Sequence, residues 1–139
     1  MFRMTREIYE VLKKEDLKVF TEESDKASEV WLQFGIKSGG SYKIKFVSFD
    51  DDHDVAVRVM GLVTVRDEAR KEPVLQVVNR LNNTFRFVKF VLDDDGDVNL
   101  EYDYLVRCPD PTASVLELIV RITSIVDQAY PDLMRAIWG

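Results

Sequence analysis

Acidic side chains gather at two places in this chain where chemistry is conceivable. The first is FDDDHDV, residues 49–55, where the only histidine, His53, lies among four aspartates. Imidazole and carboxylate groups bind metals and act as general bases, so this segment raises the hypothesis of a small metal- or ligand-responsive sensor or enzyme. A metal site needs ligands that converge from a rigid frame, whereas this segment has the composition of a turn. The pattern favours a solvated loop.

The second acidic segment is FVLDDDGDVNLEYD, residues 90–103. If Gly96 is aligned with the glycine of a calcium loop, Val91 and Tyr102 fall at positions 1 and 12, where the loop needs oxygen ligands. Apolar residues alternate on both sides of DDDGD, and Asp and Gly are the residues that tight turns prefer. The segment therefore predicts a turn between two strands and not a calcium site.

Other catalytic signatures are weak. Cys108, the only cysteine, would need a base close by, and His53 is the only histidine. The sequence contains neither GxGxxG nor a P-loop. We therefore expect no catalytic residues, no cofactor and no metal, and a protein that is not an enzyme.

Composition indicates one soluble domain, residues 1–139, with 46% hydrophobic and 32% charged residues. The start of the chain lacks the apolar region of a signal peptide, and Glu117 and Arg121 interrupt the most apolar stretch, residues 115–126. We expect a cytoplasmic location and no membrane partner. The net charge of −6, with basic residues scattered among acids, argues against nucleic acid and favours protein partners.

Hydrophobic periodicity predicts an α+β fold in the order α-βββ-α-ββ-α, an antiparallel sheet packed with helices. Residues 22–26 are polar and turn-like, and a last turn is expected after Pro131. The expected helices are 4–14, 66–85 and 110–130, and the expected strands are 28–36, 42–49, 55–65, 85–92 and 97–106.

Several of these strands carry apolar side chains on both faces. A sheet covered by helices on one side alternates apolar and polar residues, so a second apolar face has to be covered too. The cover could be the chain's own third helix, a second copy of the chain, or a client protein. The candidate residues for a dimer or client surface are Trp31, Phe49, Phe87 and Val91.

Residues 74–106 resemble the YbjN family of bacterial proteins. The resemblance consists of Asn79-Arg80-Leu81-Asn82 in a helix, an aromatic strand over 85–92, the acidic Gly turn at 93–96, and a second strand over 98–104. The long closing helix also resembles the family, whereas the first half of the chain matches only in element order. We expect Asn79 and Asn82 to cap the helix and bond the neighbouring backbone.

The resemblance implies a fold similar to the type III secretion chaperones, which are small, acidic and usually homodimeric proteins that bind other proteins. YbjN-like proteins are described as regulators of bacterial sensory transduction, and their pattern supplies no catalytic residues. We therefore expect a non-enzymatic protein-binding module, chaperone- or adaptor-like and regulatory in signalling or stress response, that forms a homodimer. The alternative is the sensor or enzyme that uses His53 and the neighbouring aspartates.

Overall fold

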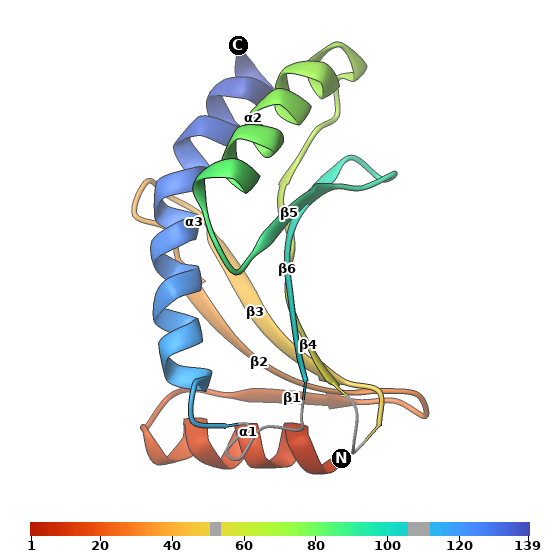
Figure 1. Ribbon diagram of the computed structural model, residues 1–139, viewed down its shortest axis with the longest axis vertical. Helices are drawn as coiled ribbons and strands as arrows, with labels where there is room; N and C mark the ends of the chain where they lie inside the picture. Colours follow the sequence, from red (N-terminus) through yellow and green to blue (C-terminus); the bar gives the residue numbers. More distant parts are fainter. Residues whose placement is uncertain (51–53, 106–111) are drawn as a thin grey trace.

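The computed structural model describes residues 1–50, 54–105 and 112–139. Its helices lie on one side of a six-stranded antiparallel sheet, an α+β architecture as predicted (Figure 1). His53 and Cys108 fall outside the described residues. The elements in chain order are α1 (Arg3–Lys14), β1 (Phe20–Glu23), β2 (Ser28–Gly35), β3 (Ser41–Ser48), β4 (Asp54–Thr64), the 3-10 helix η1 (Glu68–Arg70), α2 (Lys71–Thr84), β5 (Lys89–Leu92), β6 (Asp97–Leu105) and α3 (Val115–Trp138).

The strands are ordered β1-β2-β3-β4-β6-β5 in the sheet. The predicted meander of three strands is β2, β3 and β4, and α2 carries the chain from β4 to the far edge, where β5 and β6 form a hairpin. The predicted order lacks β1, which precedes the meander. The polar sequence of β1, FTEE, resembles a turn, but its backbone pairs with β2 over all four residues, and main-chain pairing does not require apolar side chains.

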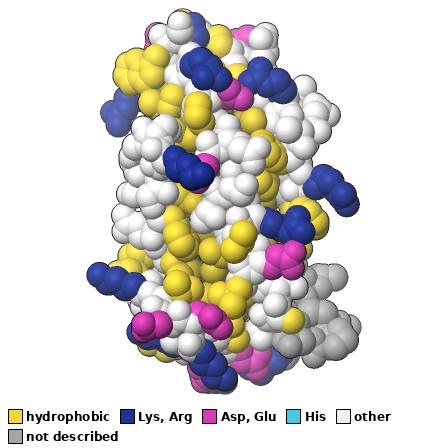
Figure 2. Space-filling model, turned by 90° about the vertical axis from the view of Figure 1, so that its left-hand side faces the viewer, with side chains coloured by type: hydrophobic (Ala, Val, Ile, Leu, Met, Phe, Trp, Pro, Cys, Tyr) yellow, Lys and Arg dark blue, Asp and Glu magenta, His cyan; other side chains and the backbone are white. Residues whose placement is uncertain are grey.

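One face of the sheet forms the core together with all three helices. In β3, Tyr42, Ile44 and Phe46 are buried on this face, and Lys43 and Lys45 point away from it. Figure 2 shows the side where α3 lies, with hydrophobic side chains along the middle of that side and charged ones mainly at its ends and margins. Within the described residues, no helix is long and apolar enough to cross a lipid bilayer.

Helix α3 runs without interruption from Val115 to Trp138, so the prediction of a separate last turn after Pro131 is wrong. A proline inside a helix removes one backbone hydrogen bond and costs about 3 kcal/mol. Ala129, Leu133 and Ala136 are buried on both sides of this position. Their burial favours continuation of the helix, because a break would withdraw the last two turns from the core.

The acidic segment at residues 93–96 forms the turn of the β5–β6 hairpin, as predicted. The carboxylate of Asp93 accepts hydrogen bonds from the side-chain amide of Asn99 (2.9 Å) and from the backbone N–H groups of Asp95 (2.9 Å) and Asp97 (3.0 Å). These bonds, that of Asn99 first, hold the pKa of Asp93 below its ordinary value. The side-chain oxygen of Asn99 in turn accepts a hydrogen bond from the backbone N–H of Gly61. Gly61 lies in a bulge of β4, where three residues of β4 stand opposite one residue of β6.

Gly96 is required by this turn. Its φ is +86°, and a Cβ built on it would lie 2.6 Å from the carbonyl oxygen of Val65. The Val65 N–H also donates to the carbonyl oxygen of Gly96 (2.7 Å), so the turn is held directly against the end of β4. Any other residue would have a strained backbone here, and its Cβ would collide with the carbonyl oxygen of Val65.

Gly96→Ala is expected to lower the free energy of unfolding by about 1–3 kcal/mol, measured by urea denaturation. The matched control is Gly35→Ala, because Gly35 lacks a positive φ and a Cβ there would meet nothing within 4 Å. The control should change stability by less than about 1 kcal/mol. Equal losses in the two variants would contradict this account of the turn.

Asp93→Ala is expected to lower the melting temperature at pH 7. A carboxyl with a depressed folded-state pKa stabilises the fold above its unfolded pKa, and this contribution is lost as the pH falls through the folded value. The difference between wild type and variant should therefore shrink below about pH 4. Thermal denaturation from pH 7 to pH 3 measures it, with the exposed Asp94→Ala as control. A difference that is constant with pH would contradict the prediction.

Candidate functional site

The face of the sheet turned away from the helices, here called the open face, is mainly polar. No helix lies over it in Figure 1, to the right of β5 and β6. One row of side chains crosses all six strands in register. In sheet order the row is Phe20, Trp31, Lys45, Arg58, Glu101 and Lys89.

Ion pairs connect the charged residues of the open face. The terminal nitrogen of Lys45 lies 3.3 Å from Glu29, that of Lys89 lies 3.7 Å from Glu101, and a guanidinium nitrogen of Arg58 lies 2.6 Å from Asp103. An antiparallel sheet with helices on one face commonly presents such a solvated second face. The expectation that this second face is apolar and needs a cover is therefore wrong.

Trp31 is the second residue of this row, next to Phe20 at the β1 end. Its ring stacks on Phe20 of the edge strand β1, with 4.2 Å between ring centroids and 14° between the planes. The terminal nitrogen of Lys43 lies 4.2 Å from the centroid of the Trp31 ring, and that of Lys18 lies 5.4 Å from the Phe20 ring. Stacking and cation–π attraction thus hold a half-buried aromatic pair at the β1 edge.

The other three predicted surface residues do not join Trp31. Val91 is paired with Asn99 and shares the open face, but four strand spacings, about 19 Å, separate β5 from β2. Phe49 is 60% exposed and lies just beyond the end of β3. The four residues therefore do not form one continuous patch.

Phe87 lies on the side of the helices. It precedes β5, has a φ of +77°, and its ring lies 4.9 Å from the guanidinium of Arg121 in α3. The predicted strand over 85–92 begins only at Lys89, because the left-handed backbone at Phe87 breaks the extended conformation. The prediction that Phe87 and Val91 share a face is wrong for this reason.

The two edges of the sheet differ. At the β5 edge, the side-chain amide of Asn82 accepts a hydrogen bond from the N–H of Phe90 (2.7 Å) and donates one to its carbonyl oxygen (3.0 Å). The amide of Asn82 thus occupies the place that a neighbouring strand would take. The expectation that Asn82 bonds the neighbouring backbone is confirmed. The expectation that Asn79 and Asn82 cap the helix is wrong, because α2 continues to Thr84 and its C-cap residue is Phe85.

The β1 edge has no such closure. Among the described residues, β1 pairs with β2 alone. In an antiparallel pair, alternate residues direct both backbone groups away from the neighbour, so half of the β1 backbone groups face outward. An exposed strand edge of this kind is a template for another strand.

Asp, Glu, His and Cys side chains do not converge in the part of the chain that the structure describes, which contains no group of three or more that could hold a metal ion. Residues 51–53, which include His53 and two of the aspartates of the sensor hypothesis, lie outside that part. The features that remain are the free β1 edge with its aromatic pair, and a hollow between α2 and α3.

Asn82→Ala is expected to lower the free energy of unfolding by about 1–3 kcal/mol in urea denaturation, because it leaves the N–H and C=O of Phe90 without partners. Alanine is the better helix former, so helix propensity alone would change stability in the opposite direction. The matched control is Asn79→Ala about one turn earlier in α2, at a position that is exposed like that of Asn82. An Asn82 variant as stable as the Asn79 variant would show that the edge needs no closure.

Comparison with known proteins agrees with this architecture. A solved structure, "Crystal structure of YbjN, a putative transcription regulator from E. coli", covers 91% of this chain and 90% of that chain with a TM-score of 0.58. Its sequence identity is 18%, so the likeness shows the fold alone. No curated protein matches the sequence. The sequence model of the YbjN family, described as "Putative bacterial sensory transduction regulator", matches residues 6–134. The chain therefore belongs to the YbjN family.

Proposed function

We propose that this protein is a non-enzymatic regulatory module that binds an extended segment of a partner protein at the edge of β1. The observation that carries the proposal is the contrast between the two edges: Asn82 bonds both backbone groups of Phe90 in β5, whereas β2 is the only described strand that pairs with β1. A segment added to β1 would make main-chain hydrogen bonds with those outward groups, as in other cases of strand addition.

The side chains around β1 supply the specificity. Alternate side chains of an added strand would lie on the open face beside Phe20, which with Trp31 offers an aromatic surface held in place by Lys18 and Lys43. Glu22 and Glu23 give β1 two carboxylates, and the second already pairs with the amino group of Met1 at 2.5 Å. An extended segment with apolar residues and at least one Lys or Arg fits this surface best.

A homodimer, the second part of the proposal, would use the same edge. Two β1 strands placed antiparallel would join two six-stranded sheets into one. A partner segment would then compete with the second copy, which is a simple way to couple partner binding to dissociation of the dimer. We place this module in the cytoplasm, without a membrane or nucleic-acid partner.

The test measures the mass of the protein by light scattering over a concentration series, in wild type and in two variants. Wild type is expected near twice 16.1 kDa at high concentration. Phe20→Ala should raise the dissociation constant at least tenfold, because it removes the aromatic surface at the shared edge. Val91→Ala, on the same face but at the opposite edge, should leave it unchanged. A dimer equally sensitive to both changes would contradict the use of the β1 edge.

Peptide binding is tested separately by fluorescence. Trp138→Phe leaves Trp31 as the only tryptophan, so its emission reports on the β1 edge. Extended peptides with alternating apolar and basic residues are expected to change this emission, and Phe20→Ala should abolish the change. Binding that responds to Mg²⁺ or Zn²⁺ and is lost in His53→Ala would instead support the rival sensor hypothesis.

A further inference from the structure

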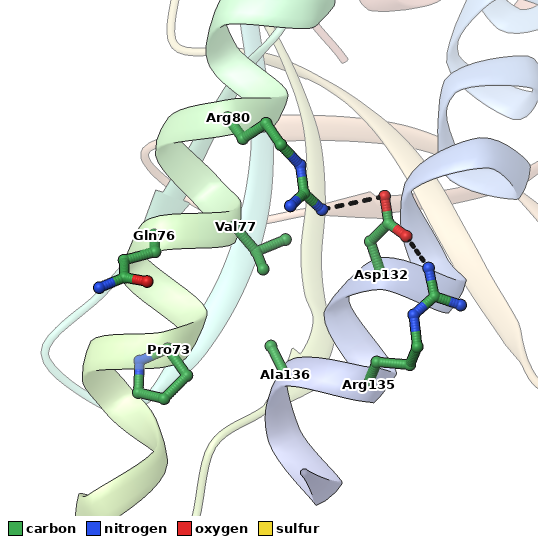
Figure 3. Close-up of a pocket in the computed structure, with 7 residues that line it drawn as sticks. All are labelled: Pro73, Gln76, Val77, Arg80, Asp132, Arg135 and Ala136. Atoms are coloured by element: carbon green, nitrogen blue, oxygen red, sulfur yellow. Dashed lines mark hydrogen bonds and ion pairs between the residues drawn. The ribbon is translucent and has the colours of Figure 1, made fainter.

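A hollow of about 450 Å³ lies between the first half of α2 and the end of α3. Pro73, Val77 and Ala136 form its apolar walls, and Figure 3 shows Arg80 and Arg135 directed from the two helices toward Asp132. In Figure 2, Lys and Arg side chains gather around an acidic one near the upper end of the molecule, where Figure 1 shows the end of α3 beside α2.

One carboxylate in this hollow holds two guanidinium groups. Arg80 lies 3.2 Å from one oxygen of Asp132, and Arg135 contacts the other oxygen. A guanidinium has five N–H donors, so each arginine keeps several after its contact with Asp132. The arginine side chains are 60% and 73% exposed, against 28% for Asp132, so the remaining donors are open to solvent at the rim.

The charges of the hollow do not balance. Arg80, Arg135 and Asp132 sum to +1 on a protein whose net charge is −6. A further arginine, Arg70, is not part of this lining, and its Nε donates a hydrogen bond to the carbonyl oxygen of Ala136 at 2.9 Å. A bridge that served only to hold α2 to α3 would need one arginine for one carboxylate, and exposed pairs of this kind add little stability. The second arginine is therefore unexplained by packing.

We propose that this hollow binds a carboxylate group. The guanidinium fork fits a carboxylate with two parallel hydrogen bonds, and an excess of one positive charge suits a monoanion. Asp132 holds both guanidinium groups at the rim, and the apolar walls accept the carbon chain that carries the ligand's carboxylate. The hollow lies among the helices and not at the β1 edge, so this proposal and the proposed function can fail independently.

The carboxylate could belong to a free small acid or to a Glu or Asp side chain of a protein segment. The experiment titrates the full chain with sodium acetate, with sodium succinate and with a short peptide of glutamates, at constant ionic strength in sodium chloride. Backbone amide chemical shifts of Gln76, Val77 and Ala136 report binding. Saturable shifts with the free acids identify a small-molecule site, and shifts with the peptide alone identify a protein-segment site.

Arg80→Gln and Arg135→Gln are each expected to weaken binding about tenfold, a loss of one charge-assisted contact of about 1.4 kcal/mol. The matched control is Arg121→Gln, on the same helix as Arg135 but paired with Glu117 and outside the hollow. It should bind like wild type. Shifts that persist in the double variant R80Q/R135Q, or no saturable shift with any of the three ligands, would overturn the proposal.

Asp132→Asn distinguishes a site that binds a carboxylate from an ion-pair bridge that only joins α2 to α3. This change removes the internal carboxylate that competes for the guanidinium groups and raises the local charge to +2, so the ligand should bind several-fold more tightly. A bridge that only joins the helices predicts lower stability and no gain in ligand binding. Ligand affinity in Asp132→Asn equal to or below that of wild type would therefore count against the site, even if the arginine variants fail to fold.

Discussion

An antiparallel sheet that buries one face in the core exposes its other face and its two edges to solvent or to a partner. This constraint determines the rest of the structure. The three helices all contribute to the core on the same face, and α3 alone buries eight residues from Val115 to Ala136. Because no helix of the described residues covers the second face, its side chains are ion-paired and polar. At each edge of the sheet, the outward backbone groups are either hydrogen-bonded within the chain or available to another strand.

The two edges are treated differently by the sequence. At β5, a single amide from α2 replaces a neighbouring strand, which both ties α2 to the sheet and prevents further pairing at Phe90. At β1, two glutamates and an aromatic pair border backbone groups that face outward. A regulatory protein that binds through strand addition needs one closed edge and one open edge, since two open edges would favour uncontrolled association.

Periodicity predicts those parts of the fold in which side chains decide the outcome. Alternation gives β2, β3, β4 and β6, and Asp/Gly chemistry gives the turn at Asp93–Gly96. Periodicity fails where the backbone or a long-range contact decides: the polar β1 forms through main-chain pairing with β2, α3 continues through Pro131 because of packing, and Phe87 leaves the strand by a left-handed φ. Trp31 stacks on Phe20, which lies 11 positions earlier in the sequence, and Arg80 pairs with Asp132, which lies 52 positions later. No local sequence pattern links the two members of either pair.

The most direct test of this account is amide hydrogen exchange of the two edge strands, followed by NMR over a range of protein concentrations. The account predicts that the Phe90 amide is protected at every concentration, because its hydrogen bond to Asn82 lies within the monomer. Outward amides of β1 should exchange rapidly in dilute solution and become protected as the concentration rises or a binding peptide is added. Protection of β1 that is independent of concentration and of peptide, or an unprotected Phe90, would contradict it.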